Sequence, residues 1–324
     1  MLTPYRSPSW LPGPHLQTIY PAAWMRLPHV DYRREQWDTP DGDFIELDWT
    51  GTDQAEAPLV VLFHGLEGNS RSHYALRLMA LMQHKKWRGV VVHFRGCGGS
   101  LNLQPRGYHC GDSAEIDWIL RRLRSQHGGP IYAVGVSLGG NILLKWLGEQ
   151  QHAASSVIDK AAAISAPVSL PTTGHLLGRG FNKVYTRRFL KTLRPKALAM
   201  IARHRMSFDS SAIRSVRNLW HYDNLFTAPL HGFKDADDYW QQSNSRPFLK
   251  KIQLPTLLLN ARNDPFLPER DLPTADEVSA FVLRDFPKHG GHGGFASPTI
   301  GRGVANNRQD WLPERIVAFF ETGQ

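Results

Sequence analysis

The stretch Gly135-Val136-Ser137-Leu138-Gly139 follows a short apolar run, Ile131 to Val134, and precedes a segment with helical character, Gly140 to Glu149. A Gly-x-Ser-x-Gly pentapeptide between a strand and a helix predicts a serine on a sharp, strained turn. Such a serine occupies a backbone region that side chains generally avoid. The flanking glycines lack a Cβ atom, so strand and helix can close on the turn without a clash. We therefore predict that Ser137 is presented as a nucleophile at the end of a central strand.

A serine hydroxyl is a weak nucleophile, so this prediction requires a base and an acid that orients the base. Where the nucleophilic serine lies on such a strand-to-helix turn, the acid follows the serine in the sequence and the histidine follows the acid. Asp264 lies in the sequence Ala261-Arg262-Asn263-Asp264-Pro265, directly after the apolar run Thr256 to Asn260. An aspartate there is also a common turn-former. We nevertheless choose Asp264 as the acid over Asp271 and Asp285, because neither of these follows that run.

The histidine is expected in the loop after the last strand, which reads Lys288-His289-Gly290-Gly291-His292-Gly293-Gly294-Phe295. Glycines in this loop let the backbone bring an imidazole over the serine without steric conflict. His289 and His292 are both candidates. We prefer His292, because it has a glycine pair on either side and lies further from the strand.

The negative charge that develops in acyl transfer needs preorganised hydrogen-bond donors, which form an oxyanion hole. The sequence His64-Gly65-Leu66-Glu67-Gly68 follows a predicted strand that ends at Phe63, where one such amide is expected. The other amide belongs to the residue after the nucleophile. We assign the oxyanion hole to the backbone amides of Leu66 and Leu138, although a His-Gly pair alone also suits a tight turn.

Apolar runs alternate with helical patterns over most of the chain. Two strands joined by the turn at residues 40–43 are predicted over 30–37 and 44–49, and further strands over 59–63, 89–94, 131–134, 161–165, 256–260 and 278–285. Helical patterns cover 74–86, 112–124, 140–149 and 311–320. This alternation predicts an α/β fold, with a mostly parallel central sheet and helices on both of its faces.

The alternation stops over residues 167–250, where basic helical pieces are split by Pro195. Because this stretch is inserted between two sheet strands, we expect a helical cap over one end of the sheet. The core is then formed by residues 29–166 and 251–324. Residues 1–28 contain several prolines and are expected to form an extended arm, with Trp10 and Trp24 as anchors on the body.

Composition is that of an ordinary globular protein, with 41% hydrophobic and 21% charged residues among 324. No apolar run approaches the ~18 residues of a membrane span, and the N-terminus lacks the apolar core of a signal peptide. Cys97 and Cys110 have neither metal-ligand nor redox-motif spacing, so we expect a reduced, cytoplasmic setting. No loop has dinucleotide or phosphate-binding spacing. We expect neither a cofactor nor a metal.

The net charge of +9 is concentrated in one segment: residues 179–217 contain eleven Lys and Arg and a single acid, Asp209. Such a run is most often a solvated helix face. Its interleaved aromatic residues also suit contact with anionic lipid or with acidic substrates. Peripheral contact of this basic cap with the inner membrane surface is therefore one alternative. Nucleic acid is not expected as a partner, because no recognition motif accompanies the charge.

With these residues identified, the chain resembles the YheT-like esterases, family 4 of the α/β-hydrolase superfamily, over nearly its full length. The resemblance rests on stretches at residues 14–19, 63–68, 93–97, 135–141, 227–233, 263–266 and 290–295. It implies an α/β-hydrolase fold, a Ser137, Asp264 and His292 triad, and carboxylic-ester hydrolysis, with acylglycerol and phospholipid activities among eukaryotic relatives. Asn263 stands where relatives often carry a second acid.

Three functional hypotheses follow. The first is a serine hydrolase that cleaves short- to medium-chain acyl esters, or monoacylglycerol and other lipid esters, through an acyl-enzyme. The second is an acyltransferase that uses the same triad with an alcohol or lipid acceptor. The third is a lipid-surface binding protein on a hydrolase scaffold. The presence of all three triad residues, Ser137, Asp264 and His292, argues against this third hypothesis.

Overall fold

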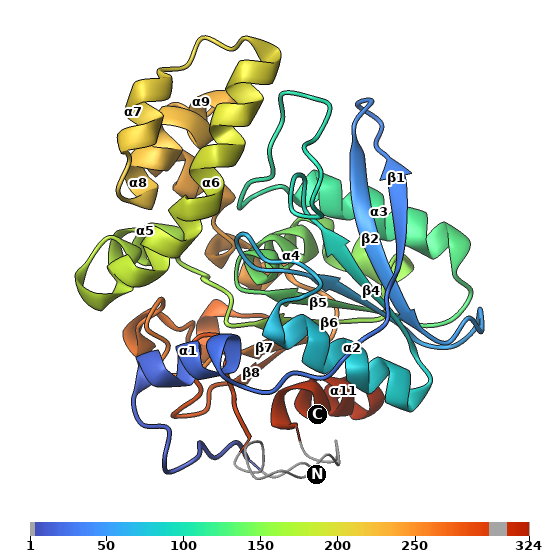
Figure 1. Ribbon diagram of the computed structural model, residues 1–324. Coiled ribbons are helices and arrows are strands. Elements are labelled where there is room, and N and C mark those ends of the chain that lie inside the picture. The colour runs from blue at the N-terminus through green and yellow to red at the C-terminus, as the bar shows by residue number, and fades with distance from the viewer. Residues whose placement is uncertain (1–3, 298–309, 324) are drawn as a thin grey trace.

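The computed structural model describes residues 4–297 and 310–323, and its centre is an eight-stranded sheet with the order β1-β2-β4-β3-β5-β6-β7-β8 (Figure 1). β1 and β2 pair antiparallel, as do β2 and β4, whereas all pairs from β4 to β8 are parallel. The strands are β1 (Arg33–Asp38), β2 (Phe44–Gly51), β3 (Leu59–Phe63), β4 (Arg88–His93), β5 (Ile131–Val136), β6 (Lys160–Ile164), β7 (Thr256–Leu259) and β8 (Val282–Asp285).

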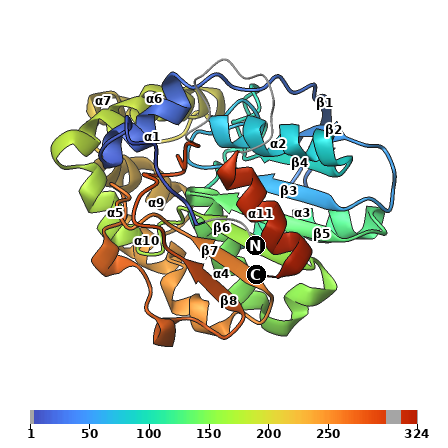
Figure 2. The same cartoon turned by 90° about the horizontal axis from the view of Figure 1, so that it is seen from below.

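Helices cover both faces of this sheet (Figures 1 and 2), and the predicted α/β fold class is confirmed. Alternate residues of the buried strand β3 show the two layers: Val61 and Phe63 pack with one helix pair, and Val60 and Leu62 with the other. The first pair is α3 (Ser113–Gln126) and α4 (Leu138–Gln150), and the second is α2 (His73–Lys85) and α11 (Trp311–Thr322).

Between β6 and β7 the chain leaves the sheet and forms a group of helices beyond one end of it (Figure 1). We call residues 167–250 the cap segment. Its longest helix, α6, has Pro195 inside it. Apolar side chains of α6, α7 and α8 pack in one cluster, which also includes Phe266 of the core. The α-helices of this segment are α5 (Leu170–Leu177), α6 (Lys183–His204), α7 (Ser210–Ser215), α8 (Leu219–Tyr222), α9 (Ala228–Leu230) and α10 (Ala236–Ser243).

The prediction of an extended arm over residues 1–28 is wrong for its central part, which forms helix α1 (Pro14–Ala23). Pro14 occupies the first turn of this helix, where its fixed φ angle fits and its missing N–H costs nothing. The prolines therefore mark the start of a helix as well as extended chain.

The prediction that Trp10 and Trp24 anchor the arm on the body is also wrong, because these residues are 50% and 65% exposed. The Trp10 ring packs on Tyr20 of the same arm, with ring centroids 4.8 Å apart. The arm is held instead through Leu11, Gln17 and Met25, which are buried. Burial of an amide side chain requires hydrogen-bond partners, and those of Gln17 are Leu11 O in the arm and two groups near the ends of β7 and β8, Asn263 Nδ2 and the Gly290 amide.

Candidate active site

Ser137 lies on the turn between β5 and α4 with φ 53° and ψ −119°, a backbone conformation that costs energy for a residue with a side chain. Its amide donates to Ile164 O of the neighbouring strand β6 at 2.8 Å. Its carbonyl accepts the Asn141 amide at 3.0 Å, which is the first hydrogen bond of α4. The turn is therefore held on both sides, and Ser137 stands at the N-terminus of a helix.

The glycines around the turn are required by close backbone contacts. A Cβ atom at Gly139 would lie 2.3 Å from Phe63 O, and one at Gly135 would lie 2.4 Å from Gly139 O. On the loop after β3, a Cβ atom at Gly65 would lie 3.1 Å from Ser137 Cβ. The loop at Gly65 thus approaches the serine closely.

The structure brings the three predicted triad residues together at the carboxyl ends of β5, β7 and β8. His292 Nε2 lies 2.8 Å from Ser137 Oγ, and His292 Nδ1 lies 2.8 Å from Asp264 Oδ2. A carboxylate partner places the ring proton on Nδ1, which leaves Nε2 free to accept the proton of the serine hydroxyl. The Asp264 side chain is fully buried, and its other oxygen accepts the Phe266 amide at 2.8 Å.

The rival residues lie elsewhere. His289 is exposed. Asp285 pairs with Arg315 Nε at 2.7 Å, and the carboxylate of Asp271 lies 3.7 Å from Arg270.

The loop that carries His292 is tied to the core by hydrogen bonds to its backbone. The Gly293 amide donates to Ser165 Oγ at 2.8 Å, and Gly293 O lies 3.0 Å from His73 Nε2. The buried Arg77 guanidinium donates to Gly294 O at 2.8 Å. These bonds fix the backbone on the C-terminal side of His292.

The amides assigned to the oxyanion hole, those of Leu66 and Leu138, have no hydrogen-bond partner within the described ranges, and both residues line the cavity beside Ser137. The turn before Leu66 is held by His64, whose Nε2 accepts the Phe94 amide at 3.1 Å. The opposite ring nitrogen, Nδ1, therefore carries the proton and donates to Gly65 O at 2.7 Å. Burial lowers the pKa of His64 to about 3, so the ring is neutral.

A cavity of about 150 Å³ opens beside Ser137 between the core and the cap segment. Its walls are mainly apolar, with aliphatic and aromatic side chains from both parts of the chain. Those nearest in sequence to the site are Leu66, Leu138 and Phe266, and the cap segment contributes Leu177, Phe189, Leu193, Met200, Phe226 and Trp240.

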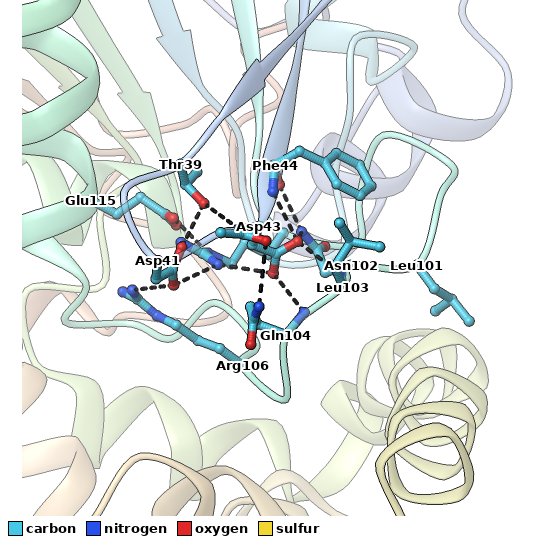
Figure 3. Close-up of polar contacts among 12 residues, drawn as sticks. Thr39, Asp41, Asp43, Phe44, Leu101, Asn102, Leu103, Gln104, Arg106 and Glu115 are labelled. Carbon is cyan, nitrogen blue, oxygen red and sulfur yellow. Dashed lines mark hydrogen bonds and ion pairs between the residues drawn. The ribbon is translucent and has the colours of Figure 1, made fainter.

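One wall of this cavity is the loop after β4, which a network of charged and amide groups holds in place (Figure 3). The Asp43 carboxylate accepts Asn102 Nδ2 at 2.9 Å, the Leu103 amide at 2.8 Å and Arg95 Nη1 at 3.0 Å. Burial alone would raise the pKa of Asp43, but these hydrogen bonds lower it below its usual value. The wall is therefore a fixed part of the site.

An ion pair joins the cap segment to the loop of Leu66. Lys196 Nζ of α6 lies 2.9 Å from Glu67 Oε2, and the Glu67 side chain is only 6% exposed. Tyr108 OH donates to Glu67 Oε1 at 2.8 Å and accepts the Glu67 amide at 3.0 Å. The residue after Leu66 is thus held by its carboxylate and by its backbone.

Several residues around the triad carry no sequence signal that would have revealed them. Gln17 and Thr18 of α1 bind the loops of Asp264 and His292, Asn263 joins these two loops, and Ser165, which follows β6, binds the His292 loop. A hydroxyl or amide side chain distant in sequence has no pattern of its own. For Gln17 and Thr18, only the stretch at residues 14–19 that carries the family resemblance marked their position.

In the part of the chain that the structure describes, no group of three or more His, Cys, Asp or Glu residues is arranged to hold a metal ion. Within the same residues, no helix is both long enough and apolar enough to cross a bilayer. Cys97 and Cys110 are both free thiols.

Comparison with known proteins identifies the family. The alpha/beta hydrolase fold family matches residues 58–296. A protein of Escherichia coli (strain K12) named "Putative esterase YheT" is 36% identical over 314 residues, which cover 95% of this chain and 90% of that protein. The chain belongs to the alpha/beta hydrolases, among the YheT-like esterases.

Two further similar proteins have lower sequence identity. The mouse protein named Phospholipase ABHD3 is 29% identical, over 86% of this chain and 73% of its own length. Among solved structures, an esterase from Exiguobacterium antarcticum matches with a TM-score of 0.54 and 18% identity, over 89% of this chain and 99% of its own. That likeness establishes the shared fold alone.

Proposed function

We propose that the protein hydrolyses carboxylic esters, with Ser137 as nucleophile, His292 as general base and acid, and Asp264 as the orienting acid. The observation that carries the proposal is the unbroken hydrogen-bond chain from Ser137 Oγ through His292 to Asp264, at 2.8 Å in each link. Membership of the YheT-like esterases supports the same reaction.

In the first half of the reaction, Ser137 Oγ attacks the ester carbonyl carbon while His292 Nε2 takes the hydroxyl proton. The oxygen of the tetrahedral intermediate accepts hydrogen bonds from the amides of Leu66 and Leu138. Each such donor typically contributes about 3 kcal/mol to transition-state binding. His292 then gives its proton to the leaving alkoxide, and an acyl-enzyme on Ser137 remains.

In the second half, His292 Nε2 deprotonates a water molecule that attacks the acyl carbonyl, and the acid leaves when Ser137 regains its proton. Asp264 stabilises the positively charged imidazole in both halves. An alcohol or lipid acceptor in place of this water would make the protein an acyltransferase with the same residues. Analysis of the products with and without added alcohol distinguishes the two.

The apolar cavity beside Ser137 supports an acyl chain as the part of the substrate that the cap segment binds. A short- to medium-chain ester or a lipid ester fits this chemistry, and the name of the mouse relative, a phospholipase, agrees with a lipid substrate. We therefore propose that residues 167–250 act as a cap that selects the acyl group, placed over a core of residues 29–166 and 251–324.

Substitution of the nucleophile tests the reaction. A fluorophosphonate probe is expected to label the protein, and Ser137→Ala is expected to abolish both labelling and hydrolysis of a graded series of p-nitrophenyl and monoacylglycerol esters. Ser165→Ala is a useful comparison, because Ser165 is also buried near the site but hydrogen bonds to Gly293. Full labelling of Ser137→Ala would overturn the assignment.

Contact with an anionic lipid surface is a second role that one observation favours. Of the eleven Lys and Arg residues over 179–217, only Lys196 pairs with a carboxylate among the described residues. Beside these charges, Phe181 and Val184 of the cap segment and Leu16 of α1 are 51%, 46% and 43% exposed. Helix α1 and the cap segment are in contact, because the ring centroids of His15 and Phe181 are 4.4 Å apart. Cations next to exposed apolar side chains suit a membrane interface.

Vesicle sedimentation tests this role. The protein is expected to pellet with vesicles that contain anionic lipid, and not with zwitterionic vesicles at physiological salt. Lys183→Glu with Arg187→Glu should abolish sedimentation, whereas the same change at the exposed Lys250 and Lys251 should preserve it. Equal binding of the wild type and both variants would count against residues 179–217 as the contact surface.

A further inference from the structure

Helix α1 presents two buried polar side chains to the loops that carry Asp264 and His292. Gln17 and Thr18 are 2% and 8% exposed, and they come from the opposite end of the chain to these loops. In Figure 2, α1 lies beside the cap segment, away from the helices that cover the faces of the sheet. Helix α1 therefore packs next to the site and not on a face of the sheet.

The Gln17 side chain joins the two loops to each other. Gln17 Oε1 accepts hydrogen bonds from Asn263 Nδ2 and from the Gly290 amide, both at 2.9 Å. Asn263 immediately precedes Asp264, and its own Oδ1 accepts the Gly291 amide at 3.1 Å. Gln17 Nε2 donates to Leu11 O at 2.9 Å, which fixes the direction of the amide.

The Thr18 hydroxyl binds the backbone of the histidine itself. Thr18 Oγ1 accepts the His292 amide at 2.9 Å and donates to Pro14 O at 2.8 Å. Because the imidazole is attached to this backbone, the hydroxyl sets the point from which the ring reaches Ser137. The core bonds described above hold the residues after His292, and Thr18 holds His292.

The glycine-rich loop is shaped to the surface of α1. A Cβ atom at Gly291 would lie 2.7 Å from Thr18 Oγ1, and one at Gly294 would lie 2.0 Å from Gln17 O. Gly291 also has a φ of 62°, which favours glycine. Residues with a side chain at positions 291 and 294 would clash with α1, so this path of the loop requires glycine at both positions.

We propose that Gln17 and Thr18 are positioning residues for catalysis, and that α1 completes the catalytic centre by holding His292 and Asp264 in register with Ser137. This inference rests on the proposed ester hydrolysis. A helix that only covered the core would contribute apolar side chains, whereas α1 contributes the acceptors for three loop donors, namely Asn263 Nδ2 and the Gly290 and His292 amides. Displacement of His292 weakens proton transfer from Ser137 and leaves the acyl cavity unchanged.

The consequence is a selective loss of kcat. Misplacement of a reacting group by about 1 Å costs on the order of 100-fold in rate. Thr18→Val keeps the shape of the side chain and removes the acceptor, so we expect kcat to fall roughly 10- to 100-fold while KM changes by less than about threefold. Gln17→Met, which cannot accept a hydrogen bond, is expected to give a loss of the same kind.

Conservative and distant variants separate positioning from folding. Thr18→Ser retains the hydroxyl and should keep most of the wild-type kcat. Thr256→Val removes a buried hydroxyl that donates to Leu254 O at 2.8 Å, at the start of β7 and so at the opposite end of that strand from the Asp264 loop. It should lower Tm without lowering kcat. Stoichiometric fluorophosphonate labelling gives the concentration of folded sites to which each kcat is normalised.

The outcomes distinguish this inference from the proposed function. A wild-type protein that hydrolyses no ester would reject the function. An active wild type, an inactive Ser137→Ala and an unchanged kcat in Thr18→Val and Gln17→Met would reject the role of α1. If either α1 variant does not fold, Asn263→Ser removes the same bridge while α1 stays intact, and a wild-type kcat there would also reject the inference.

Discussion

The hydrogen bond from His292 Nδ1 to Asp264 decides which ring nitrogen faces Ser137. Asp264 Oδ1 is already engaged by the Phe266 amide, so only Oδ2 is directed at the ring. An asparagine at this position would keep its carbonyl oxygen on Phe266 and turn its NH2 group toward His292. The ring proton would then be forced onto Nε2, where it blocks removal of the serine proton.

Asp264→Asn is therefore expected to lower kcat by about 10⁴-fold, as the loss of the correct tautomer does in serine proteases, with little change in Tm. Asp285→Asn is the matched control, since Asp285 ends β8 and pairs with Arg315. It should keep the wild-type kcat. Initial rates on one p-nitrophenyl ester are sufficient, and a reversed order of the two variants would identify Asp285 as the acid.

The sequence predicts individual site residues where the chemistry requires a particular residue type directly after a strand. The order serine, aspartate, histidine and the ends of the predicted strands placed Ser137, Asp264 and His292 at one edge of the sheet, and the structure puts them in hydrogen-bond contact. Their catalytic role stays a prediction. The support from Thr18 was beyond prediction, because an isolated threonine shows no periodicity or spacing.

Among the elements, α6 carries exposed cations and one partly buried ion pair. Lys196 is the cation of this helix that reaches into the cavity wall, where it meets Glu67 next to Leu66. Because the Glu67 carboxylate is only 6% exposed, removal of its counter-ion destabilises the folded state. The cap segment is thereby attached to the loop of Leu66, whose amide we propose for the oxyanion hole.

Lys196→Met is expected to lower the free energy of unfolding by about 1–3 kcal/mol, less than for a fully buried pair because the lysine is 32% exposed. Lys191→Met, on the exposed face of the same helix, should change it by less than about 0.5 kcal/mol. Urea unfolding provides the measurement. The double variant Glu67→Gln with Lys196→Met should recover part of the loss, and an additive double variant would show that the pair is not coupled.

The elements themselves were predictable to different degrees. Apolar runs identified the buried strands, because a strand covered on both faces is apolar throughout. The last strand was predicted from Val278 but begins at Val282, because residues 279–282 form a turn in which the Val282 amide donates to Ser279 O at 3.1 Å. Helix α1 was missed because proline is read as a helix breaker, although at the first turn it favours a helix.

For the molecule as a whole, burial of neutral histidines makes stability depend on pH. Burial lowers the pKa of four imidazoles to about 3, namely those of His64, His73, His109 and His231. The unfolded chain takes up these protons near the usual pKa of 6.5, so the unfolded state binds more protons as pH falls below about 6.5. Burial raises the pKa of Glu115 to about 7 and of Asp223 to about 6, which opposes the effect with two groups.

The histidines outnumber the two acids, so the free energy of unfolding should decrease between pH 7 and pH 5, by a few kcal/mol in order of magnitude. Urea unfolding at pH 8, 7, 6 and 5 measures this slope. His64→Gln should make the slope shallower by about one proton, whereas a change at the exposed His152 should have no comparable effect. A stability that is constant or increases toward pH 5 would contradict the prediction.

The meeting of α1 with the glycine loop has a consequence for anyone who shortens or transplants this fold. The stretch that matches the alpha/beta hydrolase family begins at residue 58, so a chain trimmed to it would keep the proposed triad yet lose Gln17 and Thr18. Such a fragment would have to supply new acceptors for the Gly290 and His292 amides. The smallest working unit of this protein is therefore expected to be larger than residues 58–296, and fusions or tags at the N-terminus should leave residues 11–18 undisturbed.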